Sequence, residues 1–155
     1  MLGLPFAFAD FFSRTHVGPA VADLYRRAFQ ATAFGDEPRV NVTIHVMCAP
    51  TEEEALFLAS SRKFQRATRD LGMRSGLLSP EEVASYPWPE EIRKAAAEAS
   101  PSAIDGTPAQ VRQGLFERAE AYGTTDIGIV TNCYAFADRV RSYELVAKEF
   151  GLSAD

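Results

Sequence analysis

The chain lacks long apolar runs and an excess of positive charge, and each absence excludes a class of protein. No stretch approaches the ~20 consecutive apolar residues of a membrane-spanning helix. The 16 lysines and arginines are outnumbered by 21 acidic residues, which gives a formal net charge of −5. Nucleic acids and anionic membranes both select a basic surface, so neither is expected as the main partner. The apolar first twelve residues lack the basic segment of a signal peptide, and we expect a cytoplasmic protein.

Metal-binding and phosphate-binding motifs are also missing. Only two cysteines occur, Cys48 and Cys133, and no cysteine or histidine pair has the spacing of a zinc site. Neither G-x-G-x-x-G nor G-x-x-x-x-G-K is present. We therefore expect no metal centre and two reduced, buried thiols.

What the sequence does contain is an alternation of short apolar runs with amphipathic segments. The runs 4–9, 39–49 and 126–131 have the composition of buried β-strands. In run 39–49, apolar side chains alternate with polar ones. The apolar set is Val40, Val42, Ile44 and Val46, and the polar set is Asn41, Thr43 and His45. The apolar row should face the core, while the polar row faces solvent or the inside of a barrel.

Capping signals place the helices between these strands. Thr107, Pro108 and Gln110 form a Thr-Pro-x-Gln start, and Gly123 is a typical stop. Capping boxes at 51–54 and 79–82 begin two more helices, and further helices are expected at 18–29, 90–99 and 136–150. We interpret residues 70–103 as a helical excursion within a single domain that spans 1–155.

The predicted element order is that of a parallel α/β protein. Strands joined by helices should pair in parallel, with right-handed crossovers. Three strands cannot close a barrel, which needs about eight. The sequence therefore predicts an open sheet whose edge strands leave backbone groups unpaired, above all at 126–131.

Four segments carry a resemblance to a known family. They are 4–9 (LPFAFA), 40–55 (VNVTIHVMCAPTEEEA), 104–111 (IDGTPAQV) and 139–147 (RVRSYELVA). In this order they resemble the C-terminal portion of the bacterial luciferase-like, flavin-dependent monooxygenases. The resemblance implies a partial TIM barrel, with about three β/α units of parallel strands and a helical excursion. It also implies FMN as cofactor, a flavin reductase that supplies reduced FMN, and a small organic substrate that is oxidised.

Candidate site residues follow from the strand ends, because TIM-barrel sites lie at the C-terminal ends of the strands. The candidates for cofactor binding are Asp10, Phe12, His45, Asn132 and Tyr134. His45 could line a flavin or substrate pocket, or be a hydrogen-bonded structural histidine. Asp10 could be a general base or a local loop cap. Four aromatic side chains could stack on the flavin ring, or belong to the core or an interface: Phe11, Phe12, Trp88 and Tyr134. No catalytic residue can be assigned from the sequence.

Three functional hypotheses remain open at this point. The first is a luciferase-like monooxygenase polypeptide, truncated to its C-terminal part and weak or inactive alone, because the family's earlier strands carry most of the flavin site. The second is a non-catalytic assembly module that pairs through open barrel edges with a second copy or with a separately encoded N-terminal half. The third is a small-molecule site in the groove left by the missing strands.

Overall fold

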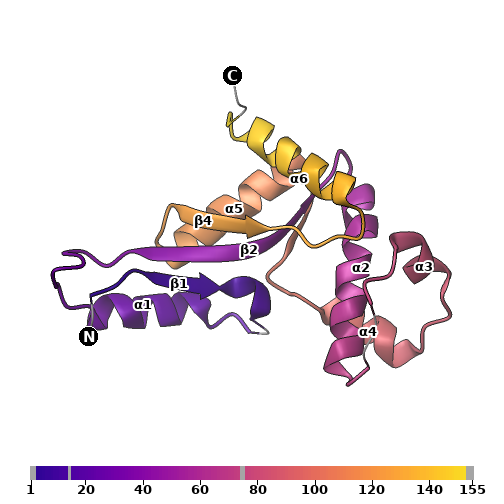
Figure 1. Cartoon of the computed structure of the whole chain (residues 1–155), viewed down its shortest axis with the longest axis horizontal. Coiled ribbons are helices and arrows are strands. Elements are labelled where there is room, and N and C mark those ends of the chain that lie inside the picture. Colours follow the sequence, from indigo (N-terminus) through magenta and orange to yellow (C-terminus); the bar gives the residue numbers. More distant parts are fainter. Residues whose placement is uncertain (1–2, 14, 74–75, 153–155) are drawn as a thin grey trace.

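The structure is a computed structural model that describes residues 3–13, 15–73 and 76–152. A four-stranded parallel sheet is organised around one long strand, as Figure 1 shows. The strands are β1 (Phe6–Ala9), β2 (Val40–Cys48), β3 (Ile104–Gly106) and β4 (Asp126–Val130). β1 pairs with residues 40–43 of β2, β4 with residues 41–45, and β3 with residues 46–48. Since β1 and β4 share partners on β2, they lie on its opposite edges.

Helices connect the strands and cover the sheet. They are a 3-10 turn (Asp10–Phe12), α1 (Gly18–Ala28), α2 (Glu52–Asp70), α3 (Pro80–Ser85), α4 (Glu90–Glu98), α5 (Pro108–Tyr122) and α6 (Phe136–Glu149). α2, α3 and α4 gather beyond the carboxyl ends of β1 and β2 (Figure 1). Among the described residues, no helix is both long and apolar enough to cross a membrane.

The expected caps are present, and at the start of α2 the cap is the single hydrogen bond from the Glu54 N–H to the Thr51 side chain. The Thr107 side chain accepts the Gln110 N–H, and the Gln110 side chain accepts the Thr107 N–H, which completes a capping box at the start of α5. Gly123 ends that helix with φ of 57°, a left-handed conformation that glycine adopts without strain. A full capping box also begins α3 at Ser79.

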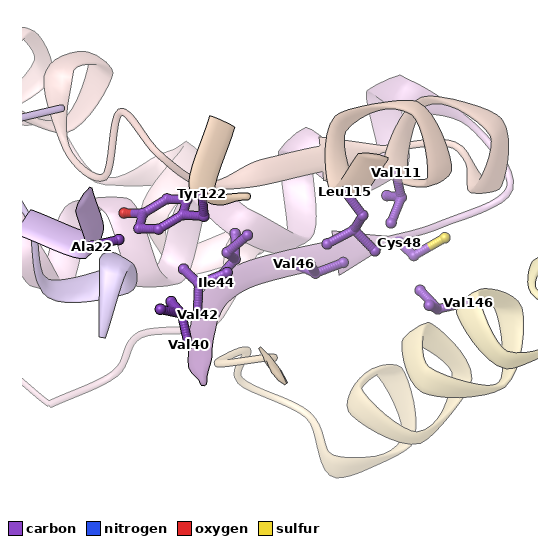
Figure 2. Packing of buried hydrophobic residues seen from close by; sticks show 10 residues of the cluster. All are labelled: Ala22, Val40, Val42, Ile44, Val46, Cys48, Val111, Leu115, Tyr122 and Val146. Carbon is purple, nitrogen blue, oxygen red and sulfur yellow. The ribbon is translucent and has the colours of Figure 1, made fainter. Parts of the chain in front are cut away.

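The main core lies on the apolar face of β2. As Figure 2 shows, side chains from β2 pack against α1, α5 and α6, and the cluster comprises Ala22, Val40, Val42, Ile44, Val46, Cys48, Val111, Leu115, Tyr122 and Val146. A smaller apolar cluster joins the end of β2 to α2 through Met47, Ala49, Ala55, Ala59 and Cys133. The apolar row predicted for 39–49 is therefore confirmed as the centre of the core.

The expectation of three strands was wrong. Residues 104–106 form a fourth strand, β3, where the sequence analysis expected only the approach to a helix. Aspartate and glycine are poor strand formers, so no local signal marks this segment. It is a strand because it pairs with the last three residues of β2. The other strands begin or end within two residues of their predicted limits.

Candidate functional site

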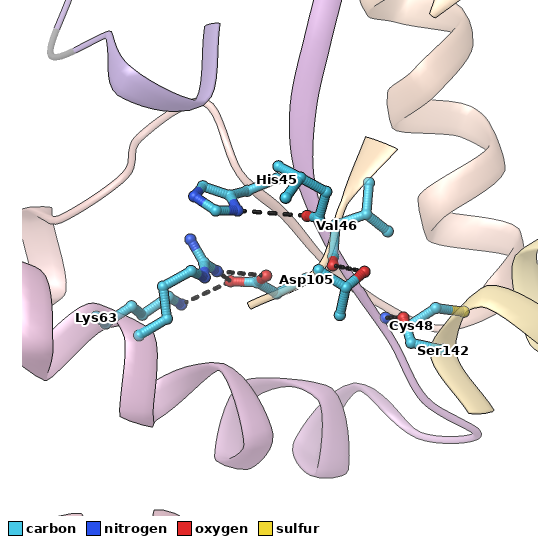
Figure 3. Close-up of polar contacts among 9 residues, drawn as sticks. His45, Val46, Cys48, Lys63, Asp105 and Ser142 are labelled. Carbon is cyan, nitrogen blue, oxygen red and sulfur yellow. Dashed lines mark hydrogen bonds and ion pairs between the residues drawn. The ribbon is translucent and has the colours of Figure 1, made fainter. Parts of the chain in front are cut away.

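The polar row of β2 runs into a buried charged cluster at the carboxyl end of the sheet. We name it the His45 cluster, which comprises His45 on β2, Arg62, Lys63 and Arg66 on α2, and Asp105 on β3. The Asp105 carboxylate accepts hydrogen bonds from Arg62 Nη2 at 2.7 and 2.9 Å, and Lys63 Nζ lies 3.1 Å from Asp105 Oδ2. Figure 3 shows the Lys63–Asp105 pair near His45. Arg62 and Lys63 thus both pair with Asp105, while Arg66 Nε lies 3.8 Å from Oδ2 of a second acid, Asp70.

His45 is buried and neutral. Its Nδ1 lies 3.3 Å from the Val130 carbonyl oxygen, and its ring meets the ring of Phe11 edge-on, with 5.2 Å between the ring centroids. Because a carbonyl can only accept, Nδ1 carries the hydrogen and Nε2 keeps its lone pair. Burial, and then the positive charge of Arg62, lowers the pKa of His45 to about 4, against the opposing effects of the Val130 carbonyl and Asp105. At neutral pH the ring therefore offers an uncharged acceptor.

Arg66 ties α2 to the turn that follows β1. Its guanidinium donates to the carbonyl oxygens of Phe11 and Phe12 at 3.1 and 3.0 Å. The Phe12 backbone is thereby fixed, while its side chain is 62% exposed. Phe12 thus lies next to the His45 cluster through its main chain and offers an accessible ring.

Asp10 points to the other side of the sheet. It is buried, and its Oδ1 accepts a 2.8 Å hydrogen bond from the Tyr122 hydroxyl on α5. Burial, and then this hydrogen bond, raises the pKa of Tyr122. Oδ2 of Asp10 has no hydrogen-bond partner among the described residues. The structure therefore places Asp10 with the helical layer, and does not bring it together with His45.

The segment after β4 is held by its buried residues and leaves Asn132 and Tyr134 exposed. Thr131 Oγ1 donates to the Val46 carbonyl oxygen at 2.8 Å, and Cys133 Sγ donates to the Ala135 carbonyl oxygen at 3.3 Å. Tyr134 is 55% exposed. Among the described residues, no hydrogen bond, ion pair or ring contact joins either candidate to the His45 cluster.

Both cysteines are free and buried, as expected. Burial, and then the charge of Glu149, raises the pKa of Cys48 to about 11. Burial also raises the pKa of Cys133. Since the thiolate is the reactive form of cysteine, neither thiol is prepared to act as a nucleophile. No group of three metal-binding side chains occurs in the part of the chain that the structure describes.

Sequence reasoning identified only His45 of the five residues in the cluster. A signal for the others existed. Arg62 and Arg66 are four residues apart on the helix that the capping box at 51–54 predicts, so they share one face. That face also carries the alanines that pack on the end of β2, and this places both guanidinium groups against the sheet.

The chain is similar to proteins more than twice its length, although no family model matches it. It is 32% identical over 149 residues to the uncharacterized protein YwcH of Bacillus subtilis, a match that covers 96% of this chain and 44% of YwcH. It is 27% identical over 144 residues to a luciferase-like monooxygenase of Escherichia coli K12, covering 93% of this chain and 43% of that protein. Its relatives include luciferase-like monooxygenases.

A solved structure shares the fold. The crystal structure of apo-MsnO8 matches with a TM-score of 0.86 and 29% identity, over 99% of this chain and 47% of that chain. The predicted open, parallel α/β sheet is therefore confirmed. The chain spans less than half the length of the relatives it matches.

Proposed function

We propose that this chain acts as part of a flavin-dependent monooxygenase of the luciferase-like type, and that the His45 cluster forms one wall of its site. The observation that carries the proposal is the position of the cluster. A neutral histidine and three cations lie at the carboxyl ends of parallel strands, where α/β barrels place their sites. The relatives named luciferase-like monooxygenases support the same reaction class.

The donors of the cluster suit a flavin. FMN carries a phosphate and ring carbonyl oxygens, all of which accept hydrogen bonds. Arg62 Nη1 is buried and has no hydrogen-bond partner among the described residues, so it has a donor to offer. When bound, reduced FMN would supply the electrons that activate oxygen. The residues of this chain would orient the polar edge of the cofactor, and the neutral His45 would offer Nε2 as an acceptor beside it.

The His45 cluster would contact a flavin from one side only. A ligand held by a single wall buries little surface, and its binding free energy is correspondingly small. We expect the chain alone to bind FMN weakly, with a Kd of about 0.1 mM or higher, and to turn over little. A separate flavin reductase would supply reduced FMN.

FMN titration of the purified chain tests this proposal through quenching of flavin fluorescence. We expect saturable, weak binding that His45→Gln weakens severalfold. The other histidine, His16, is exposed, so His16→Gln is the matched control and should leave the affinity unchanged. Submicromolar binding would contradict the expected weakness. Equal affinities of the two histidine variants would place any flavin away from the cluster, and absence of binding at millimolar FMN would reject the site.

The open edge at β4 favours a second function, a non-catalytic assembly module that binds a second copy of the chain. An apolar cavity of about 380 Å³ lies between β4, α5 and α6, with Ile127, Ile129, Phe116 and Phe150 in its walls. Leu152, which is 71% exposed, also lines it. Unpaired strand edges beside exposed apolar surface promote association.

Light scattering over a range of concentrations tests the assembly function. We expect a dimer that Leu152→Glu converts to monomer. Leu24→Glu, at an exposed leucine of α1 outside the cavity, should leave the dimer intact. A monomer at all concentrations would count against this function. If a separately encoded polypeptide bound the monomer and Leu152→Glu abolished that binding, the occupant would be the other chain.

A further inference from the structure

A second cavity lies on the far side of α2 from the sheet. It has a volume of about 420 Å³ and is formed where α2 meets α3, α4 and the loop between them. Its lining includes Phe57, Ser60 and Phe64 of α2, Tyr86 and Trp88 of the loop, and Arg93 of α4. No member of the His45 cluster lines it, so this cavity is separate from the proposed flavin wall.

The aromatic side chains of this cavity are held in place by ring contacts and by one hydrogen bond. The Trp88 ring lies 4.9 Å from that of Phe64 and 4.3 Å from that of Tyr86, measured between centroids. Trp88 Nε1 donates a 2.9 Å hydrogen bond to the Val83 carbonyl oxygen, which fixes the indole against α3. Phe57 and Tyr86 remain largely exposed. Aromatic walls held in place in this way favour a flat, apolar ligand, because little ordering is needed on binding.

Two polar groups of the cavity have no side-chain partner among the described residues. Ser60 Oγ is buried and has no hydrogen-bond partner among the described residues. Arg93 is exposed and is the one charged residue in the described lining. No hydrogen bond or ion pair joins its guanidinium to any other described side chain. A hydroxyl and a guanidinium together offer donors to an anionic oxygen, and guanidinium groups pair with carboxylates especially well.

We propose that this cavity binds a small aromatic carboxylic acid. The ring lies against the aromatic side chains, and the carboxylate faces Arg93 with Ser60 as a second donor. A cationic aromatic ligand is disfavoured by the positive charge of Arg93. The volume is at the lower end of the range for small-molecule sites and suits one or two fused rings.

Ligand binding in this cavity can be followed by tryptophan fluorescence, because Trp88 is the only tryptophan of the chain. The probes are 4-nitrobenzoate and its neutral analogue 4-nitrobenzamide, since nitroaromatic rings quench indole fluorescence on contact. Free N-acetyltryptophanamide corrects for absorbed light, and calorimetry measures the same affinities independently. We expect saturable quenching by both compounds, with the acid binding about three- to tenfold more tightly than the amide.

The charge variants decide the role of Arg93. Arg93→Gln should abolish the preference for the acid and leave the affinity for the amide unchanged. Lys94→Gln is the matched control, because Lys94 is the next residue of α4, is also exposed, and does not line the cavity. Both positions are on the surface, so both variants should fold. Linear, unsaturable quenching, equal affinities for acid and amide, or equal effects of the two variants would each overturn the proposal.

Discussion

Acidification should destabilise this protein through His45. The pKa of the buried ring is about 4, whereas the unperturbed value of 6.5 applies in the unfolded chain. Between pH 6.5 and 4 the unfolded state therefore binds a proton that the folded state does not. The free energy of unfolding then decreases as pH decreases, since protons drive the equilibrium toward the state that binds more of them. The contribution of the neutral His45 ring to the free energy of unfolding is therefore complete above pH 6.5 and is lost by about pH 4.

The size of the effect follows from the two pKa values. A difference of about 2.5 pH units, at about 1.4 kcal/mol for each, gives about 3 kcal/mol. The cause is burial first, and then the positive charge of Arg62 on α2. Protonation would add a positive charge near Arg62 and Arg66, whose charges lower the pKa of His45, while the charge of Asp105 opposes them. A loss of about 3 kcal/mol is a large fraction of the stability of an ordinary domain.

Urea unfolding, followed by the fluorescence of Trp88 at pH values from 7.5 to 4.5, measures how the free energy of unfolding changes with pH. The His45→Gln variant should be less stable than the wild type at neutral pH. Below pH 6.5 its free energy of unfolding should change little with pH, after correction for the carboxylates that both proteins share. His16→Gln should keep the full wild-type slope, because that side chain is exposed. Equal slopes in wild type and His45→Gln would refute the reasoning. Stability that rose on acidification would mean that Asp105 makes the folded ring more basic.

Three further substitutions test the packing around the site. In urea denaturation, Asp105→Asn should lower the free energy of unfolding by about 3 kcal/mol, because it leaves the buried Arg62 guanidinium unpaired. The control Glu54→Gln, which removes an exposed ion pair, should change it by less than about 1 kcal/mol. In thermal unfolding, Gly18→Ala should lower the free energy of unfolding by about 1–3 kcal/mol, since a Cβ at this position collides with Tyr122 of α5. The control Gly76→Ala has open space around the new Cβ and should be neutral or slightly stabilising. Thr107→Ala should remove the α5 cap and cost about 1 kcal/mol in the same assay.

Local signals were sufficient for most of the fold. The alternation from Val40 to Val46 predicts β2, because a strand turns successive side chains to opposite faces. The residues Thr107 and Gly123 define the two ends of α5. β3 could not be predicted in this way. Its pairing with the end of β2 and the burial of Asp105 make it a strand, and both depend on segments distant in the sequence.

The candidate site was less accessible to sequence reasoning, for two reasons. Arginine side chains are usually exposed, and Arg62 and Arg66 are buried here because α2 packs across the carboxyl end of the sheet. Asp10, the candidate general base, lies away from the His45 cluster for a simpler reason. It has the same parity as Phe6 and Phe8, whose rings pack in the helix-covered core. Strand alternation alone could therefore have placed the Asp10 side chain on the other face.

The two proposed sites share one helix but use opposite faces of it. At about 100° per residue, Arg62 and Arg66 lie roughly opposite Ser60 and Phe64 around the axis of α2. Contacts agree, since the arginines donate hydrogen bonds to β3 and to the turn after β1, while the Phe64 ring contacts the Trp88 ring. A ligand in the aromatic cavity therefore touches no group that sets the pKa of His45. Ligand binding in the cavity should therefore leave the pH dependence of the free energy of unfolding unchanged, provided that α2 does not shift as a whole. A change in that dependence on adding 4-nitrobenzoate would thus identify α2 as the element that couples the two sites.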